Sequence, residues 1–202
     1  MWALVESGSV SKVYTRPKAI TVGDIQYPSN IFTLWTSSEL EAIGIYEVVI
    51  DNTNYKNPEY YINTDQSFAF GSGKVTASYG TATARPLDNV LWTAEDEAAD
   101  ATHVEGTVKQ AGVRPPKLVI VDQQAYSLLL PNDWMVVRNA ESSKAIPSDW
   151  LDYRVGVRSV ASSMRTKINA VANVDALAAL YMYNDATPSV RPLGEFPDAP
   201  SS

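Results

Sequence analysis

The chain has 202 residues, of which 45% are hydrophobic and 19% charged, with 16 Lys and Arg against 23 Asp and Glu. This apolar content suffices for a core and excludes a wholly disordered chain. The net charge of −7 argues against nucleic acid as the main partner, and the absence of cysteine excludes disulfides, thiolate nucleophiles and zinc ribbons. No apolar run approaches the roughly 20 residues of a membrane span, so we expect neither a transmembrane segment nor a signal peptide.

Residues 1–92 are predicted to form a β-rich module made of hairpins. Short runs of β-branched and aromatic residues alternate there with glycine-containing turns, a pattern that indicates antiparallel strands. Gly8 separates the first pair of runs, Gly23-Asp24 the second, and Gly71-Ser72-Gly73-Lys74 the third. The strand pairs expected from this pattern are residues 2–5 with 10–14, 19–22 with 25–27, and 67–70 with 75–79.

A short helix and a buried strand are expected inside this module. The segment Ser38-Glu39-Leu40-Glu41 has the spacing of a capping box, with Ser38 at the cap and Glu41 three residues further on. Gly44 is placed to end this helix. The dense run of β-branched and aromatic residues at 45–50 then predicts a buried strand.

Residues 93–112 are predicted to be an acidic linker. Between Thr93 and Thr107 the chain carries five acidic residues, no Lys or Arg, and little apolar surface beyond alanines. The segment fits either a solvated linker or a short acidic helix. It contains the single histidine, His103, for which we expect an exposed position and no catalytic role.

Residues 113–185 are predicted to form a helical module. Apolar residues recur at helical spacing through 118–130, and Pro131 closes that segment. Asn132-Asp133 then offers a cap for a short helix that starts near Trp134.

A long helix is expected with Pro147 in its first turn, because acidic residues gather early in it and basic residues follow, as the helix dipole favours. A further short helix is expected over residues 175–183. Residues 186–202 form a proline-rich tail that cannot be regular helix. The whole pattern predicts an α+β fold, with a β-rich N-terminal module, a helical C-terminal module and this tail.

The long helix carries an apolar stripe with spacings of three and four residues. Such spacing fits a coiled coil that drives trimer formation, or an amphipathic helix that packs against residues 118–130 of the same chain. Lys167 falls where the next core residue of a coiled coil should be, so we favour intrachain packing and keep self-association as the alternative. The stripe consists of Trp150, Tyr153, Val157, Val160, Met164, Ile168 and Val171.

No catalytic motif emerges, and we expect neither an enzyme nor a bound cofactor or metal. A Gly-x-Ser-x-Gly elbow is absent, and the one histidine has no persuasive partner. Paired carboxylates leave no spacing signature, so a sugar-binding or sugar-cleaving module stays open as a third possibility. Aromatic side chains that could stack on sugars are more economically explained as core of a small β-rich domain; these are Trp35, Tyr46, Tyr55, Tyr60 and Tyr61.

The second half of the chain contains a characteristic set of segments: Gln123-Gln124-Ala125-Tyr126-Ser127-Leu128-Leu129, Asn132-Asp133-Trp134, Val137-Arg138-Asn139-Ala140-Glu141, Ala145-Ile146-Pro147, Tyr153-Arg154-x-x-Val157-Arg158, and Glu195-Phe196-Pro197-x-x-Pro200. With these segments it resembles the C-terminal region of tailed-phage tail-fibre assembly proteins and related fibre-associated virion proteins, in which Trp is usual in place of Phe196. The resemblance covers roughly residues 115–200, and its signature consists of helix caps and packing residues. The start of the chain, with Trp2-Ala3-Leu4 and Tyr27-Pro28-x-Asn30-Ile31-Phe32, looks more loosely like small tail proteins of marine phages.

This resemblance implies a structural virion protein of the tail, assembled in the host cytoplasm, whose partners are other tail or fibre proteins. The alternative is a fibre-assembly chaperone that is absent from the mature particle. We expect no nucleic-acid or membrane partner.

Five residues of the helical module are expected to be helix anchors or interface residues. Trp134 and Trp150 are large enough to anchor the crossing of the short and long helices, and Tyr153 continues that face. Arg154 and Arg158, one turn apart, could pair with Glu141, with Asp149 or with a partner's carboxylate.

Overall fold

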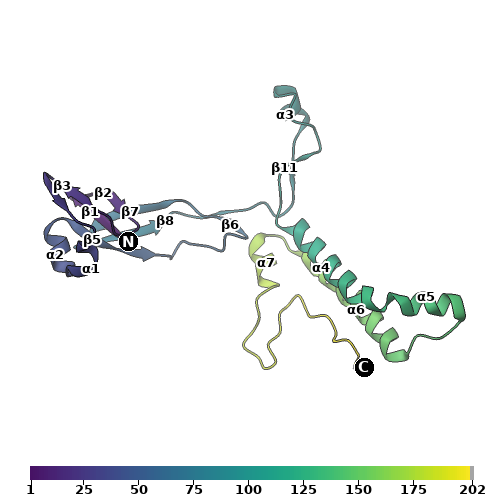
Figure 1. Cartoon of the computed structure of the whole chain (residues 1–202). Coiled ribbons are helices and arrows are strands. Elements are labelled where there is room, and N and C mark those ends of the chain that lie inside the picture. The colour runs from purple at the N-terminus through teal and green to yellow at the C-terminus, as the bar shows by residue number, and fades with distance from the viewer. Residues whose placement is uncertain (201–202) are drawn as a thin grey trace. The chain divides into compact units, whose positions relative to one another are not determined.

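The protein is a mixed α+β chain that divides into two compact units, Met1–Thr83 and Ala84–Ser202. The computed structural model describes residues 1–200. Strands predominate in the first unit and helices in the second (Figure 1).

The first unit is organised around one five-stranded sheet. Its strand order is β2-β1-β5-β8-β7, in which only β5 and β8 run parallel. The sheet curls, so that the outermost strands β2 and β7 contact each other. The strands are β1 (Trp2–Glu6), β2 (Ser9–Tyr14), β5 (Ile45–Asp51), β7 (Gln66–Gly71) and β8 (Lys74–Tyr79).

Each face of the curled sheet has its own core cluster. Successive residues of a strand point to opposite faces, so Ala3 joins one cluster and Leu4 the other. Phe32 and Leu40 complete the Leu4 cluster. The elements that bring residues to it are the hairpin β3 (Ile20–Val22) and β4 (Ile25–Tyr27), and the helices α1 (Ile31–Leu34) and α2 (Ser37–Ala42).

All three predicted hairpins are confirmed, whereas the predicted capping box is displaced by two residues. The N-cap of α2 is Thr36, whose hydroxyl accepts from the backbone N–H of Glu39 at 3.3 Å. The Glu39 carboxylate accepts from the Thr36 N–H at 2.7 Å. Ser38 therefore lies inside the first turn, and Gly44 follows the helix with a φ of 80°.

The prediction of a wholly buried strand over residues 45–50 is wrong for its second half. Ile45 and Val48 are buried, but Val49 and Ile50 are about half exposed. The exposure follows from the neighbours of β5: β1 pairs only with its residues 45–47, and among the β5 residues the Leu4 cluster includes Ile45 alone. Val48 is still covered by the cluster that contains Ala3, whereas Val49 and Ile50 belong to neither cluster.

The acidic segment is an arm with its own small structure. Strands β10 (Val90–Leu91) and β11 (Val108–Gln110) pair, and the acidic helix α3 (Ala94–Ala99) lies between them in sequence. The ring of His103 stacks on Trp92 at 3.6 Å, while the Lys109 ammonium lies 4.4 Å from the centre of the same ring. His103 is thus half-buried rather than the exposed linker residue that we expected.

The helical part consists of α4 (Arg114–Leu129), a 3-10 turn η1 (Leu130–Asn132), α5 (Asp133–Ser142), α6 (Ser148–Ala170) and α7 (Val174–Ala179). Helices α4 and α6 lie side by side (Figure 1). Four members of the predicted stripe, Tyr153, Val157, Met164 and Ile168, are buried on α6, so the helix packs within its own chain. Val160 is only half-buried, and Ala161 and Arg154 complete the buried face instead. A further two-residue pair is formed by β6 (Tyr61–Ile62) and β9 (Thr83–Ala84).

Helix α4 ends at Leu129, just before Pro131, as the sequence predicted, and Pro131 lies in η1, which leads directly into α5. One detail of this junction differs from the sequence prediction. Asn132 is not a side-chain cap, because its amide donates to the Leu128 carbonyl at 3.0 Å.

The segment after α7 is fastened to α6 by specific contacts. The Lys167 ammonium donates to the carbonyls of Pro192 and Leu193, at 2.7 and 3.2 Å. Leu193 is buried, and its N–H donates to the Leu180 carbonyl. Lys167 therefore binds this segment from the position that would have been a core residue of a coiled coil.

Candidate functional site

Arg154 is the centre of a polar junction where α4 ends and α5 begins. Its side chain is almost fully buried and donates to the Leu129 carbonyl at 3.2 Å, to the Asn132 side-chain oxygen, and to Asp133 Oδ1 at 2.6 Å. A buried guanidinium is tolerated only where its donors find acceptors. The junction thus ties the turn between α4 and α5 to α6.

Tyr153 strengthens the same junction from the neighbouring position on α6. Its hydroxyl lies 3.5 Å from the Leu128 carbonyl, one residue before the carbonyl that Arg154 binds. Trp150 is half-buried and meets the Tyr153 ring edge-on, with 5.8 Å between ring centres. Trp150, Tyr153 and Arg154 therefore lie together at this junction, where α6 contacts the turn between α4 and α5.

Trp134 and Arg158 lie elsewhere. Trp134 is 53% exposed on α5, with the Arg138 guanidinium 4.7 Å from its ring centre, so it does not fill the helix crossing. Arg158 is exposed, and its contact is with the Arg154 carbonyl at 3.5 Å. Neither Arg154 nor Arg158 pairs with Glu141 or Asp149 in the described part of the chain. The carboxylate partner of Arg154 is Asp133.

Helices α4 and α5 present an exposed apolar face that sequence reasoning missed. Its members follow one another at spacings of seven, four, four and three residues, which places them on one side of the α4–η1–α5 segment. Each is between 51% and 62% exposed. We call this set the outer stripe: Val119, Tyr126, Leu130, Trp134 and Val137.

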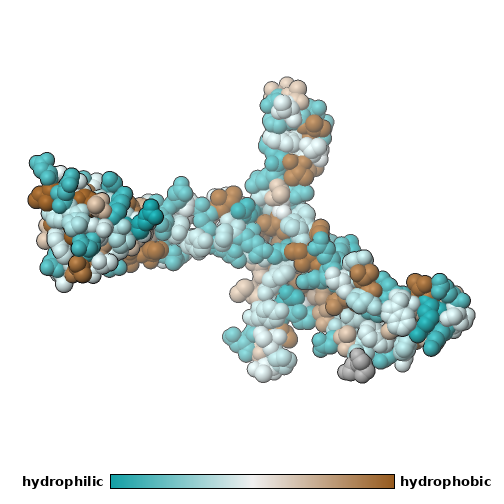
Figure 2. Space-filling model, in the orientation of Figure 1, coloured by the Kyte–Doolittle hydropathy of each residue, from teal (hydrophilic) through white to brown (hydrophobic). Residues whose placement is uncertain are grey.

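The outer stripe faces away from α6. The buried residue Val121 and the half-buried Ala125 and Leu128 lie on the other side of α4, toward α6. Figure 2 shows hydrophobic residues, in brown, at the surface over α4 and α5. The helical spacing of Val119, Tyr126 and Leu130 was visible in the sequence. Because α4 has apolar residues on two sides, periodicity alone does not say which of the two sides is buried.

A hollow of about 490 Å³ borders the outer stripe. Ile120, Gln123 and Leu128 of α4 line one side, and Glu195 and Phe196 of the C-terminal segment line the other. Apolar, amide and charged groups therefore meet in this concave surface, the charged ones being the ion pair of Arg191 with Glu195. Such a combination of flat apolar stripe and adjacent hollow suits a protein partner rather than a reacting small molecule.

The aromatic residues considered for sugar stacking are mostly part of the packing of the first unit. Tyr60 and Tyr61 are buried, Trp35 packs against the Leu4 cluster, and Tyr46 contacts Phe70 at 4.7 Å between ring centres. Tyr55 is the most exposed of the five and leans on Tyr79.

Within residues 1–200 no group of three His, Asp or Glu side chains is arranged to hold a metal ion. No helix of this described part has the length and apolar character needed to cross a membrane.

Comparison of the chain with protein-family models, with curated proteins and with solved structures found no match.

Proposed function

We propose that this chain is a structural protein of a bacteriophage tail, a tail-fibre or fibre-attachment component that acts by docking on other tail proteins in the virion. The observation that carries the proposal is the outer stripe, an exposed apolar face on well-formed helices. The resemblance of residues 115–200 to fibre-associated phage proteins names the class of partner.

The composition of the stripe supports docking. Exposed apolar residues that form a contiguous row, with polar residues beside them, mark protein interaction surfaces. Tyr and Trp are the residues that most often contribute binding energy at such surfaces, and both Tyr126 and Trp134 are present. The bordering hollow provides a place for an inserted side chain of the partner.

The buried junction gives the stripe a fixed shape. Because Arg154 binds both Leu129 and Asp133, the residues before and after η1 keep their relative positions. A preorganised surface loses less conformational entropy on binding. In this proposal the β-rich module attaches to the tail or fibre, the helical module binds the neighbour, and the proline-rich tail supports the helical module.

Quantitative mass spectrometry of purified particles, with the major capsid protein as standard, tests the proposal. We expect the chain at a fixed stoichiometric ratio to the capsid protein. Its absence from particles, together with abundance in infected-cell lysate, contradicts the structural role.

Variants of the stripe test whether it is the docking face. Tyr126→Ser combined with Trp134→Ser should remove the protein from particles while leaving it folded and present in lysate. The matched control is Met182→Ser, because Met182 is 68% exposed and lies outside the stripe. Normal incorporation of the double variant would exclude the stripe as the docking face.

The second candidate is a fibre-assembly chaperone, favoured by the location of the stripe in the helical part, where the resemblance is strongest. A chaperone would cover an unassembled fibre subunit with the same face and leave before the particle matures. Both candidates are non-catalytic. Specific glycan cleavage by the purified protein, lost on changing one carboxylate, would contradict both.

A further inference from the structure

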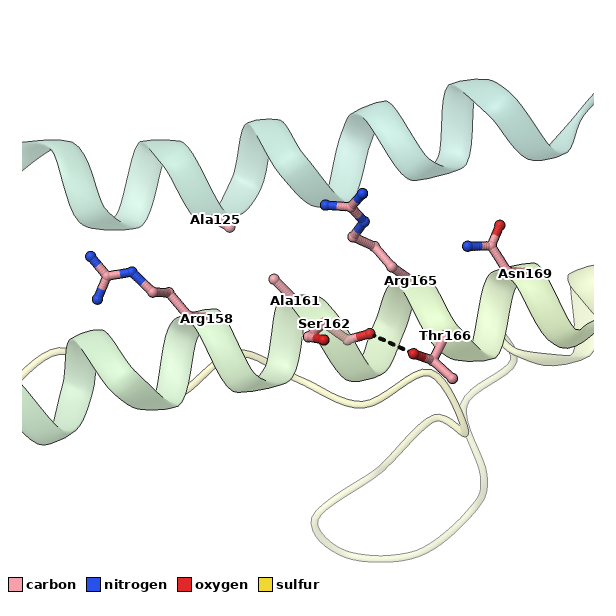
Figure 3. Close-up of a pocket in the computed structure, with 7 residues that line it drawn as sticks. All are labelled: Ala125, Arg158, Ala161, Ser162, Arg165, Thr166 and Asn169. Atoms are coloured by element: carbon pink, nitrogen blue, oxygen red, sulfur yellow. Dashed lines mark hydrogen bonds between the residues drawn. The ribbon is translucent and has the colours of Figure 1, made fainter.

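A second concave surface, a groove of about 460 Å³, lies between α4 and α6 and carries two arginines. Ala125 of α4 and Ala161 of α6 contribute only methyl groups, which leaves the space open. Figure 3 shows Arg158 and Arg165 projecting from α6, with Arg165 extended toward α4 and Asn169 one turn beyond it. The groove is therefore lined mainly by hydrogen-bond donors.

The two arginines retain donor capacity. Arg158 makes its one recorded hydrogen bond, at 3.5 Å, to a backbone carbonyl, and no carboxylate of residues 1–200 forms an ion pair with it. Arg165 bonds Asp122 at 3.2 Å, but both side chains are more than half exposed, where an ion pair stabilises little. Because each guanidinium has five N–H donors, the groove can still bind carboxylates.

A preformed acidic element exists on the same chain. Helix α3 has no buried residue, and the segment 93–107 around it carries five acidic residues and no Lys or Arg. The Thr93 cap and the stacking of Trp92 with His103 hold its shape without burial of the helix. Lys109 pairs with Asp96. Glu97 and Asp100 accept hydrogen bonds from the Glu105 and Thr102 backbone N–H groups of the same arm, and neither carboxylate forms an ion pair with a Lys or Arg of residues 1–200.

We propose that the arginine groove of one copy binds the acidic α3 segment of a second copy of this chain. Arg158 and Arg165 are seven residues apart, about 10 Å along the helix axis. Glu97 and Asp100 are three residues apart, which puts them on neighbouring positions of one side of α3, and the long arginine side chains cover the remaining difference. Guanidinium–carboxylate hydrogen bonds are charge-assisted, which supplies the attraction.

The geometry of this contact has a consequence for assembly. The groove and α3 are different surfaces of one chain. Two copies that exchange these contacts reciprocally form a closed two-fold dimer, whereas copies that use the two surfaces with different neighbours form a ring or an open chain. The inference does not depend on the proposed tail function, because it concerns only the association of the purified chain with itself.

Complementation between two defective variants tests the proposal. Arg158→Glu damages the groove and keeps α3, whereas Glu97→Gln with Asp100→Asn removes the α3 charges, keeps the side-chain oxygens that accept hydrogen bonds within the arm, and keeps the groove. In light-scattering measurements at low salt, the wild type should form multimers whose mass rises with concentration and falls with added salt. Each variant alone should be monomeric, and their mixture should form a one-to-one dimer that cannot grow.

The control is Lys144→Glu, the same charge change at an exposed residue outside the groove; it should associate like the wild type. If Arg158→Glu does not give the wild-type circular dichroism spectrum, Arg158→Gln replaces it, with the same expected loss of multimers. A monomeric wild type at all concentrations, an associating Arg158 variant, or a mixture that stays monomeric would each overturn the proposal.

Discussion

Arg154 Nη2 lies 2.6 Å from Asp133 Oδ1, and this pair joins the second turn of α6 to the first residue of α5. The arginine side chain is 4% exposed and the aspartate side chain 48% exposed. One end of the ion pair is therefore held in the packing between helices, while the other faces solvent. The direction of α5, and with it the second half of the outer stripe, depends on this contact.

Replacement of Arg154 should therefore be strongly destabilising. Arg154→Ala removes the donor for Leu129 and Asn132 and opens a gap, so we expect the free energy of unfolding to fall by about 3 kcal/mol. Arg158→Ala, one turn further on and exposed, should change it by less than about 0.5 kcal/mol. Urea denaturation of both variants measures the difference, and equal effects would refute the assigned role of Arg154.

The two tryptophans should respond differently to truncation. Trp150 is half-buried against Tyr153, so Trp150→Ala should cost roughly 2–3 kcal/mol, below the full loss for a core aromatic residue. Trp134 is exposed and contacts Arg138, and Trp134→Ala should cost less than about 1 kcal/mol. Thermal and urea unfolding provide the comparison. A larger loss at Trp134 than at Trp150 would place Trp134 in the helix packing after all.

The arm should lose a stabilising contact in acid. The Lys109 side chain, and next the Thr93 backbone N–H, donate hydrogen bonds that hold the pKa of Asp96 below its ordinary value. A carboxyl whose pKa is lower in the folded state stabilises that state above its unfolded pKa, and the contribution is lost as the pH falls through the folded value. The difference in unfolding free energy between wild type and Lys109→Met should therefore shrink below about pH 4.

Asp96→Asn removes the same ion pair by changing its acidic partner. The difference in unfolding free energy between the wild type and Asp96→Asn should therefore shrink below about pH 4 in the same way. Two-dimensional NMR of the Trp92 indole reports the arm directly, because Lys109 and His103 lie on that ring. A pH-independent difference for both variants would show that the ion pair makes no net contribution.

Gly112 should not tolerate a side chain. A Cβ there would lie 2.6 Å from both the Cα and the carbonyl oxygen of Asp88, which are backbone atoms that cannot rotate away. We expect Gly112→Ala to cost at least about 3 kcal/mol, more than ordinary overpacking. Gly106→Ala meets no atom within 4 Å and should cost only about 1 kcal/mol for its φ of 79°. Calorimetry distinguishes the two, and a tolerated Gly112→Ala would refute this close approach.

The local elements were predictable from the sequence because their signals are local. Gly23-Asp24 sits between two short apolar runs, and the structure has a hairpin there with Gly23 at a φ of 59°. The long helix predicted with Pro147 in its first turn is present, with Pro147 as the N-cap residue before Ser148. The capping-box prediction found the right helix and the wrong cap, because Thr36–Glu39 and Ser38–Glu41 have the same spacing and only the chain path selects one.

The sequence by itself determined where strands turn, where helices lie and which side of α6 is apolar, since these follow from residues within one or two turns of each other. Only the tertiary structure decided which of the two apolar sides of α4 is covered, and that Arg154 is buried while Arg158 is exposed. Arg154 reaches its acceptors at Leu129, Asn132 and Asp133 across more than twenty residues of chain. Periodicity specifies that a face is apolar or a side chain is charged, but the partner it meets is set by how distant segments pack.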